Sequence, residues 1–232
     1  MNIAIIPARG GSKRIPRKNL KLFRGLPVIS YAIQAAIESE SFDEIFVSTD
    51  DEEIAKIAMF YGATVPWLRS KELSDDYATT LSVMQDSVNR LKSDLANIDN
   101  VCCIYPVTPL LKPIYISQGL EILKSGKWDY VFSALPTSSP HRFFSLGSSK
   151  GVEMLFFDFA RTRTQDLPLT YCDAGQFYWG KKSSWESALP ILSEKSTVLE
   201  LPNDSVVDID TVTDWSRAEQ MFDFQKYKKN EN

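Results

Sequence analysis

The chain has 232 residues and a hydrophobic fraction of 44%, which suits one well-packed domain and excludes an intrinsically disordered protein. Its formal net charge of −4 disfavours a general binder of polyanions, so we expect no nucleic-acid partner. No apolar stretch approaches the ~20 residues that span a bilayer, and the N-terminus lacks a signal-peptide pattern, so we expect no membrane association.

The three cysteines have neither the spacing of a disulfide framework nor that of a zinc site. Cys102 and Cys103 are adjacent within an apolar run, where a strand would direct their side chains to opposite faces. Cys172 is remote from both in sequence. We therefore expect reduced thiols and a cytoplasmic protein.

The N-terminal part of the chain predicts strands that alternate with helices. The apolar run 2–7 predicts a buried strand, which a basic loop follows. Residues from about 27 to 37 carry apolar side chains at helical spacing, and 44–48 predicts a second strand.

Asp50, followed three residues later by Glu53, is a capping-box signature, so a helix should begin there and end at Gly62. The pattern continues with a short strand, a helix, a strand, a helix and a strand at about 64–67, 80–91, 101–105, 113–125 and 130–135. This rhythm predicts a mostly parallel sheet with helices on both faces.

The alternation stops between about 137 and 166. Turn-forming residues at 138–140 and 147–149 separate short apolar segments, which predicts an inserted hairpin or arm. An arm that carries the apolar run 154–157 is unfavourable alone in water, so we expect it to pack against a second copy in a homodimer. Strands at 175–180, 197–201 and 206–210 and a C-terminal helix from about 212 complete a single domain over residues 1–232.

The loop that follows the first strand, PARGGSKRIPRKN at residues 7–19, carries the strongest functional signal. Open parallel sheets bind ligands at the carboxyl ends of their strands. Gly10 and Gly11 let a ligand approach backbone N–H groups, and Arg9, Lys13 and Lys18 add positive charge. The alternative is a solvated basic loop. Neither GxxxxGK[ST] nor GxGxxG occurs, which excludes a P-loop ATPase and disfavours a dinucleotide dehydrogenase.

Residues 7–19 resemble the nucleotide signature of the cytidylyltransferases that make CMP-activated acidic sugars, a family that includes the CMP-sialate and CMP-Kdo synthetases. The resemblance implies that Arg9, Lys13 and Lys18 hold the triphosphate of CTP and act catalytically. The nucleotide-binding set that it implies is Ala8, Arg9, Gly10, Gly11, Ser12, Lys13, Lys18, Asn19, Thr79 and Thr80.

Two further segments are similar to the family in position. Thr79 and Thr80 lie where a small hydroxyl residue of the family contacts the cytosine ring, although either could instead cap the following helix. The segment 105–111 stands where sialate synthetases carry a Gln-Pro-Thr-Ser-Pro-Leu-Arg string, with Tyr105 in place of the glutamine and Leu111 in place of the arginine.

Segments late in the chain resemble the sugar side of the family's site. The string RTQDLP at 163–168 implies that Arg163 and Gln165 bind the sugar acid, since arginine suits a carboxylate. The segment 171–180 differs from the sialate synthetases in a way that resembles the pseudaminic acid branch. It supplies the further substrate-side predictions Gln176 and Phe177, although at least one aromatic residue of a strand so patterned belongs to the core.

Asp208 and Asp210 close the last apolar segment at i and i+2, which on a strand would place both carboxylates on one face. A hard dication would neutralise such a pair, and the family resemblance supports both as catalytic magnesium ligands. Asp210 could instead cap the final helix. His141 is the only histidine, so hydrolysis by a serine or cysteine triad has little support.

The resemblance implies a Rossmann-like nucleotidyltransferase fold with an inserted dimerisation arm. It implies a Mg²⁺-dependent enzyme that transfers CMP from CTP to the anomeric hydroxyl of a nonulosonic acid, with pseudaminic acid favoured, and releases pyrophosphate. The alternatives are a CMP-sialate or CMP-legionaminate synthetase and, more remotely, a non-catalytic nucleotide-binding domain.

Overall fold

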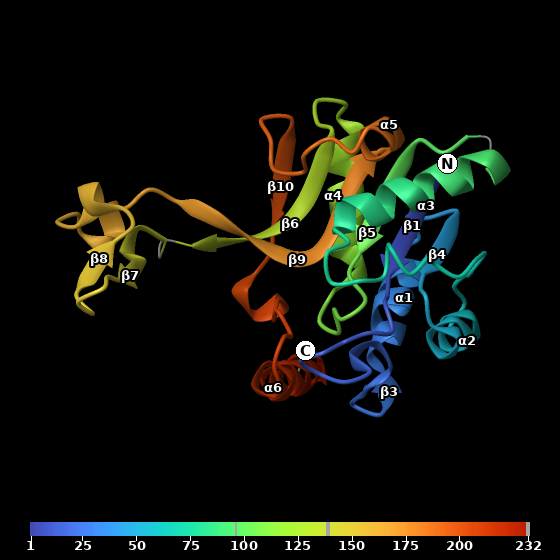
Figure 1. Ribbon diagram of the computed structural model, residues 1–232, viewed down its shortest axis with the longest axis horizontal. Coiled ribbons are helices and arrows are strands. Elements are labelled where there is room, and N and C mark those ends of the chain that lie inside the picture. The colour runs from blue at the N-terminus through green and yellow to red at the C-terminus, as the bar shows by residue number, and fades with distance from the viewer. Residues whose placement is uncertain (96, 138–139, 231–232) are drawn as a thin grey trace.

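The computed structural model describes residues 1–95, 97–137 and 140–230. Its centre is a six-stranded sheet in the order β10–β6–β9–β5–β1–β4 (Figure 1). In chain order these strands are β1 (Asn2–Pro7), β4 (Glu44–Ser48), β5 (Asn100–Ile104), β6 (Tyr130–Thr137), β9 (Thr170–Lys181) and β10 (Ser196–Glu200). Only β9 runs antiparallel to its neighbours in this sheet, so the predicted mostly parallel α/β sheet is confirmed.

Helices cover both faces of the sheet. The helices are α1 (Val28–Glu38), α2 (Glu52–Phe60), α3 (Thr80–Asp94), α4 (Pro113–Lys124), α5 (Lys182–Glu186) and α6 (Val212–Asn230). Alternate residues of β1 divide between the two cores, since Ala4 and Ile6 pack with α1, α2 and α4, whereas Ile3 and Ile5 pack with α3 and α5. No helix in the described ranges is long and apolar enough to cross a bilayer.

The cysteines take the positions that the sequence predicts. Cys102 lies in one core cluster and Cys103 in the other, and burial raises the pKa of both thiols. Cys172 is exposed, and all three are free thiols.

Asp51, not Asp50, caps α2. The Asp51 carboxylate accepts hydrogen bonds from the backbone N–H groups of Glu53 and Ile54, so the capping-box prediction was wrong by one residue. The carboxylate of Asp50 instead accepts from the Gly10 N–H at 2.9 Å, which ties the basic loop to the end of β4.

Two of the predicted strands do not form. Segment 64–67 forms only one isolated bridge, from Thr64 to Phe46 of the edge strand β4. A second isolated bridge joins Leu68, just after the segment, to Thr49. Segment 206–210 pairs with no strand, because the chain has already left the edge strand β10 and crosses toward α6. That crossing brings Asp208 and Asp210 to the edge of the sheet where β1 and β5 end.

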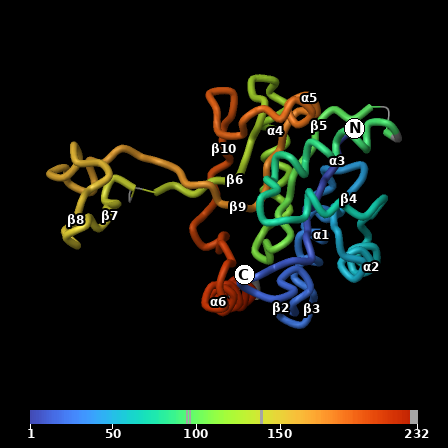
Figure 2. The backbone as a smooth tube through the Cα atoms, in the orientation of Figure 1, coloured from blue at the N-terminus to red at the C-terminus, as the bar shows by residue number. Residues whose placement is uncertain are grey.

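The chain between Thr137 and Thr170 forms an arm that projects from the body (Figure 1). Figure 2 shows the continuations of β6 and β9 leading together into it. The arm contains the hairpin β7 (Phe144–Leu146) and β8 (Val152–Met154). Residues 138–139 of the predicted turn lie outside the described residues.

A third apolar cluster positions the C-terminal helix. The hairpin β2 (Leu22–Phe23) and β3 (Leu26–Pro27) buries Phe23 against Trp215 of α6, with ring centroids 5.6 Å apart. Ile209 is buried in the same cluster. This packing holds the segment with Asp208 and Asp210 beside the basic loop.

Candidate active site

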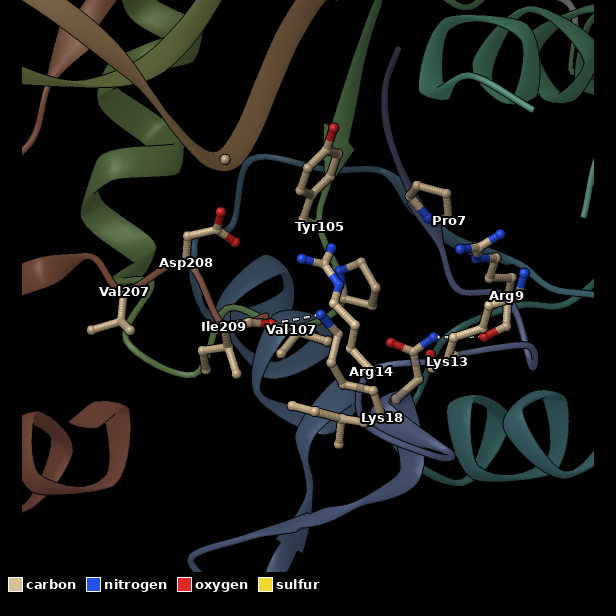
Figure 3. A pocket seen from close by; sticks show the side chains of 15 residues that line it. Pro7, Arg9, Lys13, Arg14, Lys18, Tyr105, Val107, Val207, Asp208 and Ile209 are labelled. Atoms are coloured by element: carbon tan, nitrogen blue, oxygen red, sulfur yellow. Dashed lines mark hydrogen bonds between the residues drawn. The ribbon is translucent and has the colours of Figure 1, made fainter. Parts of the chain in front are cut away.

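A cavity of about 240 Å³ opens where β1 and β5 end (Figure 3). The loop after β1 supplies one wall, with Arg9, Ser12, Lys13, Arg14, Ile15, Lys18 and Asn19. The segment after β5, strand β9 and the segment that precedes α6 supply the others, with Tyr105, Pro106, Val107, Gly175, Val207, Asp208 and Ile209. We call this the first cavity.

Short contacts with the next strand and helix fix the loop after β1. The Ala8 N–H donates to the Ser48 carbonyl at 2.9 Å, and the Asn19 side-chain amide donates to the Arg9 carbonyl at 2.9 Å. A Cβ atom on Gly10 would lie 2.7 Å from a carboxylate oxygen of Asp51. Gly10 therefore lets the loop pack closely against the start of α2, and nothing lies so close to Gly11.

Each of the five basic side chains of the loop has an acidic partner. Arg9 and Lys13 both pair with Asp76. Lys13 first and then Arg9 lower the pKa of that carboxyl. Arg14 and Lys18 pair with Asp210, and Arg17 pairs with Asp51 and Glu53. Because solvent reaches most of these pairs and screens them, they contribute little to stability. They arrange positive charge around the cavity, where an anionic ligand would compete for it.

Asp208 and Asp210 have different surroundings. Asp208 is exposed to the first cavity and, in the described ranges, has no hydrogen bond or ion pair. Partial desolvation by the surrounding protein and repulsion from Asp210 raise the pKa of Asp208. Asp210 lies 2.8 Å from Arg14 and 3.5 Å from Lys18, and Lys18 also donates to the Ile209 carbonyl at 2.6 Å.

Asp210 does not cap α6. The Asp214 carboxylate accepts from the backbone N–H groups of Asp210 and Thr211, and the Thr211 hydroxyl accepts from the Asp214 N–H. Thr211 and Asp214 form the capping box, so the alternative prediction for Asp210 was wrong.

A second cavity of about 460 Å³ adjoins the first and shares Pro7, Arg9, Arg14, Tyr105 and Pro106 with it. Its other wall consists of Arg69, Leu73, Asp75, Asp76, Ala78, Thr80 and Val83. The two cavities together form one bipartite site.

The sequence-based interpretation missed Arg69. The side chain is 7% exposed, burial lowers its pKa, and its guanidinium Nε donates to the Ser74 hydroxyl at 3.1 Å. A buried arginine that faces a cavity is a candidate ligand contact, because its charge is costly without a partner. The only signal in the sequence was one arginine directly after the apolar residues 65–68.

The two adjacent threonines have different roles. Thr79 caps α3, since its hydroxyl accepts from the Ser82 N–H at 3.1 Å, and this capping accounts for the residue. The Thr80 hydroxyl lies 3.1 Å from the hydroxyl of Tyr105 and faces the second cavity.

A family model described as Cytidylyltransferase matches residues 3–182. The chain belongs to this cytidylyltransferase family. A pseudaminic acid cytidylyltransferase of Campylobacter jejuni is 42% identical to it over 95% of this chain and 96% of the relative. A CMP-N,N'-diacetyllegionaminic acid synthase of Legionella pneumophila is 35% identical over 97% of both chains.

The fold also matches a solved CMP:2-keto-3-deoxy-manno-octonic acid synthetase complexed with CTP. The TM-score is 0.70 at 14% identity, and the match covers 97% of this chain and 99% of that one. At this identity the likeness establishes the fold alone, which is the predicted Rossmann-like nucleotidyltransferase fold.

Within this cytidylyltransferase chain, most of the predicted nucleotide-side residues converge. Arg9, Ser12, Lys13, Lys18 and Asn19 line the first cavity, and Arg9 and Thr80 line the second. The remaining members of the set, Ala8, Gly10, Gly11 and Thr79, line neither cavity. Their contacts shape the loop and cap α3.

Two of the sugar-side predictions need correction. Phe177 is fully buried between α4 and the sheet, where its ring faces Gly119, so it has no surface to offer a sugar. Gln176 is 3% exposed, and its side-chain amide donates to the Ser205 carbonyl at 3.0 Å. Gln176 therefore anchors the segment that leads to Asp208, whereas Tyr105 does line both cavities.

Arg163 and Gln165 lie in the arm, away from these cavities. Both are exposed, and Arg163 pairs with Asp166 at 2.8 Å. Neither residue lines the first or second cavity of its own chain. The predicted arm at about 137–166 already contained both residues, but the sequence could not show that the arm projects away from the cavities (Figure 1).

Proposed function

We propose that this chain transfers CMP from CTP to the anomeric hydroxyl of a nonulosonic acid and releases pyrophosphate, with pseudaminic acid as the favoured acceptor. The observation that carries the proposal is the bipartite site. Arg9, Lys13 and Lys18 face Asp208 across one cavity, and a second cavity with a buried arginine adjoins it. The similarity to pseudaminic acid cytidylyltransferases over 95% of the chain supports this choice of acceptor.

The two cavities suit the two ends of a nucleotide. Apolar side chains, Arg69 and the Thr80 hydroxyl line the second cavity, which suits a flat base with a polar edge. Four further charged residues, Arg9, Arg14, Asp75 and Asp76, complete its wall. The cations of the first cavity suit a triphosphate. Arg9 lines both cavities, so the α-phosphate would lie near it, between base and leaving group.

In the proposed reaction the anomeric oxygen forms a bond to the α-phosphorus while the bond from that phosphorus to the bridging oxygen breaks. Pyrophosphate leaves with the bonding electrons, and the attacking hydroxyl loses its proton. Arg9, Lys13 and Lys18 would hold the triphosphate and stabilise charge on the leaving group, which is catalysis by position and electrostatics.

Asp208 and Asp210 fit a divalent cation. Asp208 faces the cavity, and the local field disfavours its charge, which a dication would stabilise. No group of three or more potential ligand side chains occurs within the described residues. Mg²⁺ needs no more than one or two carboxylates when phosphates and water complete its shell. When bound, it would offset the charge of the triphosphate. Asp210 would have to release Arg14 or Lys18 to take part.

We also propose that the enzyme works as a homodimer. Phe143, Phe144, Leu146, Val152 and Leu155 of the arm are all more than half exposed, which is costly for an isolated chain. If Arg163 and Gln165 contact the acceptor, as the family resemblance implies, they must do so in a second copy. A mass in solution at micromolar concentration equal to one chain would refute the dimer. The free thiols fit a cytoplasmic location.

Pyrophosphate release with CTP and Mg²⁺ tests the function. We expect turnover with pseudaminic acid that exceeds turnover with legionaminic acid, N-acetylneuraminic acid and Kdo. Higher turnover with one of the other acids would change the proposed acceptor but leave the proposed reaction class unchanged. Binding of CTP without pyrophosphate release for any acid would refute the enzyme and favour a nucleotide-binding domain.

A further inference from the structure

Strand β9 contains a bulge at the edge of the first cavity. Phe132 of β6 is opposite Tyr178, but Ala134 is opposite Asp173, so residues 174–177 all stand against Ser133. The Ser133 hydroxyl accepts the backbone N–H groups of Gln176 at 3.3 Å and Phe177 at 3.2 Å, which stabilises the irregular segment.

The bulge folds Asp173 back onto Tyr178. The Tyr178 hydroxyl donates to one carboxylate oxygen of Asp173 at 2.7 Å, and the Gly175 N–H donates to the other at 2.8 Å. Gly175 has a φ of 60°, a left-handed conformation that glycine adopts readily and that makes this turn possible. A regular strand would hold residues 173 and 178 about 17 Å apart.

Tyr178 in turn supports Tyr105. Tyr178 is 4% exposed, and its ring lies between those of Phe132 at 5.9 Å and Tyr105 at 5.3 Å. The backbone N–H of Tyr105 donates to the Gln176 carbonyl of the bulge at 2.9 Å. Its hydroxyl lies 3.1 Å from Thr80 on the opposite side of the site. The Tyr105 ring is thus held between the bulge and α3.

Tyr105 stands where the two cavities meet. Figure 3 shows its ring between Asp208 on one side and Pro7 and Arg9 on the other. Pro106 and Val107, which follow it in the chain, and Gly175 of the bulge line the same cavity, and all three are neutral. This wall suits the uncharged part of the acceptor, because the triphosphate cations lie on the opposite loop.

We propose that Asp173 and Tyr178 are positioning residues that hold Tyr105 in place as the acceptor-side wall and so set the affinity for the sugar acid. A carboxylate only accepts hydrogen bonds, so the Tyr178 hydroxyl proton is committed to Asp173. The phenol oxygen of Tyr178 and its ring are then fixed against Tyr105. The inference rests on the proposed function. The proposed role of the cations that hold the triphosphate does not depend on Asp173 or Tyr178.

The test uses steady-state kinetics of the full-length enzyme with pseudaminic acid and CTP. Tyr178→Phe and Asp173→Ala should each raise the KM for the sugar acid by about two- to tenfold, the effect expected for one lost hydrogen bond. The KM for CTP should rise less than the KM for the sugar acid, because Tyr105 is only one of the residues that line the second cavity. In the double variant the KM for the sugar acid should be no higher than in the more impaired of the two single variants, because both changes break the same contact.

Two further variants separate positioning from general loosening. Asp173→Asn keeps one acceptor oxygen, which can serve Tyr178 while the contact with the Gly175 N–H is lost, so it should restore part of the sugar affinity that Asp173→Ala loses. Tyr130→Phe is the matched control, because its buried hydroxyl has no hydrogen-bond partner in the described chain. It should leave both KM values unchanged.

An unchanged KM for the sugar acid in Tyr178→Phe would overturn the inference. So would equal increases in both KM values, or the same increase in Tyr130→Phe. If the wild-type enzyme turns over no sugar acid, the proposed function fails, and that outcome is distinct from a wild-type enzyme whose variants behave normally.

Discussion

Replacing Gly10 by alanine should damage the packing of the basic loop against α2. The added Cβ would lie 2.7 Å from a carboxylate oxygen and 3.1 Å from the Cβ of Asp51, so the whole side chain must shift. Asp51 cannot shift freely, because it caps α2 and pairs with Arg17. Loss of an aspartate cap costs about 0.5–2 kcal/mol.

We therefore expect Gly10→Ala to lower the free energy of unfolding by about 1–2 kcal/mol, measured by urea denaturation. For a chain of this size the melting temperature should fall by about 2–4 °C per kcal/mol. Binding of CTP, measured by calorimetry, should weaken as well, because the loop that carries Arg9 and Lys13 moves.

Gly11→Ala is the matched control. Nothing lies within 4 Å of a Cβ atom built on Gly11, so this variant should keep wild-type stability. In an Asp51→Ala background the clash with the carboxylate disappears and only the 3.1 Å contact with the Cβ of residue 51 remains, so Gly10→Ala should then cost less than it does in the wild type. The reasoning fails if Gly10→Ala is as stable as the wild type, or if Gly11→Ala is equally unstable.

Three other substitutions test separate parts of the site. Asp208→Asn should reduce kcat by about 10²-fold or more in the pyrophosphate assay, because the proposed cation loses a ligand. The same variant should melt at a higher temperature than the wild type at pH 7. The fold raises the pKa of Asp208, so its ionised form costs stability, and this cost disappears as the pH falls through that pKa. A lower melting temperature of Asp208→Asn would contradict the conclusion that the ionised Asp208 carboxylate costs stability. Arg69→Met should weaken CTP binding about 10- to 100-fold without loss of fold, since its buried charge is itself costly. An affinity for CTP equal to that of the wild type would show that Arg69 does not contact the base in the second cavity. Thr79→Ala should cost about 1 kcal/mol of unfolding free energy through the lost cap and leave the KM for CTP unchanged, whereas a large KM effect would make Thr79 a ligand contact.

The local pattern was sufficient for the sheet and the nucleotide loop. Short apolar runs such as 2–7 and 101–105 predicted buried strands, and helical spacing after Pro27 identified the first helix. Arg9, Lys13 and Lys18 lie at the end of β1, so the general rule for parallel sheets located their cavity.

Where neighbouring residues offer the same chemistry, the pattern could not choose between them. Asp50 and Asp51 can both cap a helix, and only the packing of Gly10 shows which one does. Thr79 and Thr80 differ in the same way, since one caps α3 and the other meets Tyr105. A hydrogen bond to a residue far away in the chain leaves no trace in the local sequence.

By itself the sequence determined the α/β class, the arm and the anionic character of the ligand, because hydrophobic periodicity, turn residues and charge act over a few residues. Only the tertiary structure decided that Phe177 belongs to the core, that Arg163 lies away from both cavities, that Arg69 lines the second cavity and that Asp173 accepts a hydrogen bond from Tyr178. These facts depend on contacts between segments far apart in the chain. The bulge in β9 shows why: its position follows from the pairing of β6 with β9, and pairing is a property of the whole sheet.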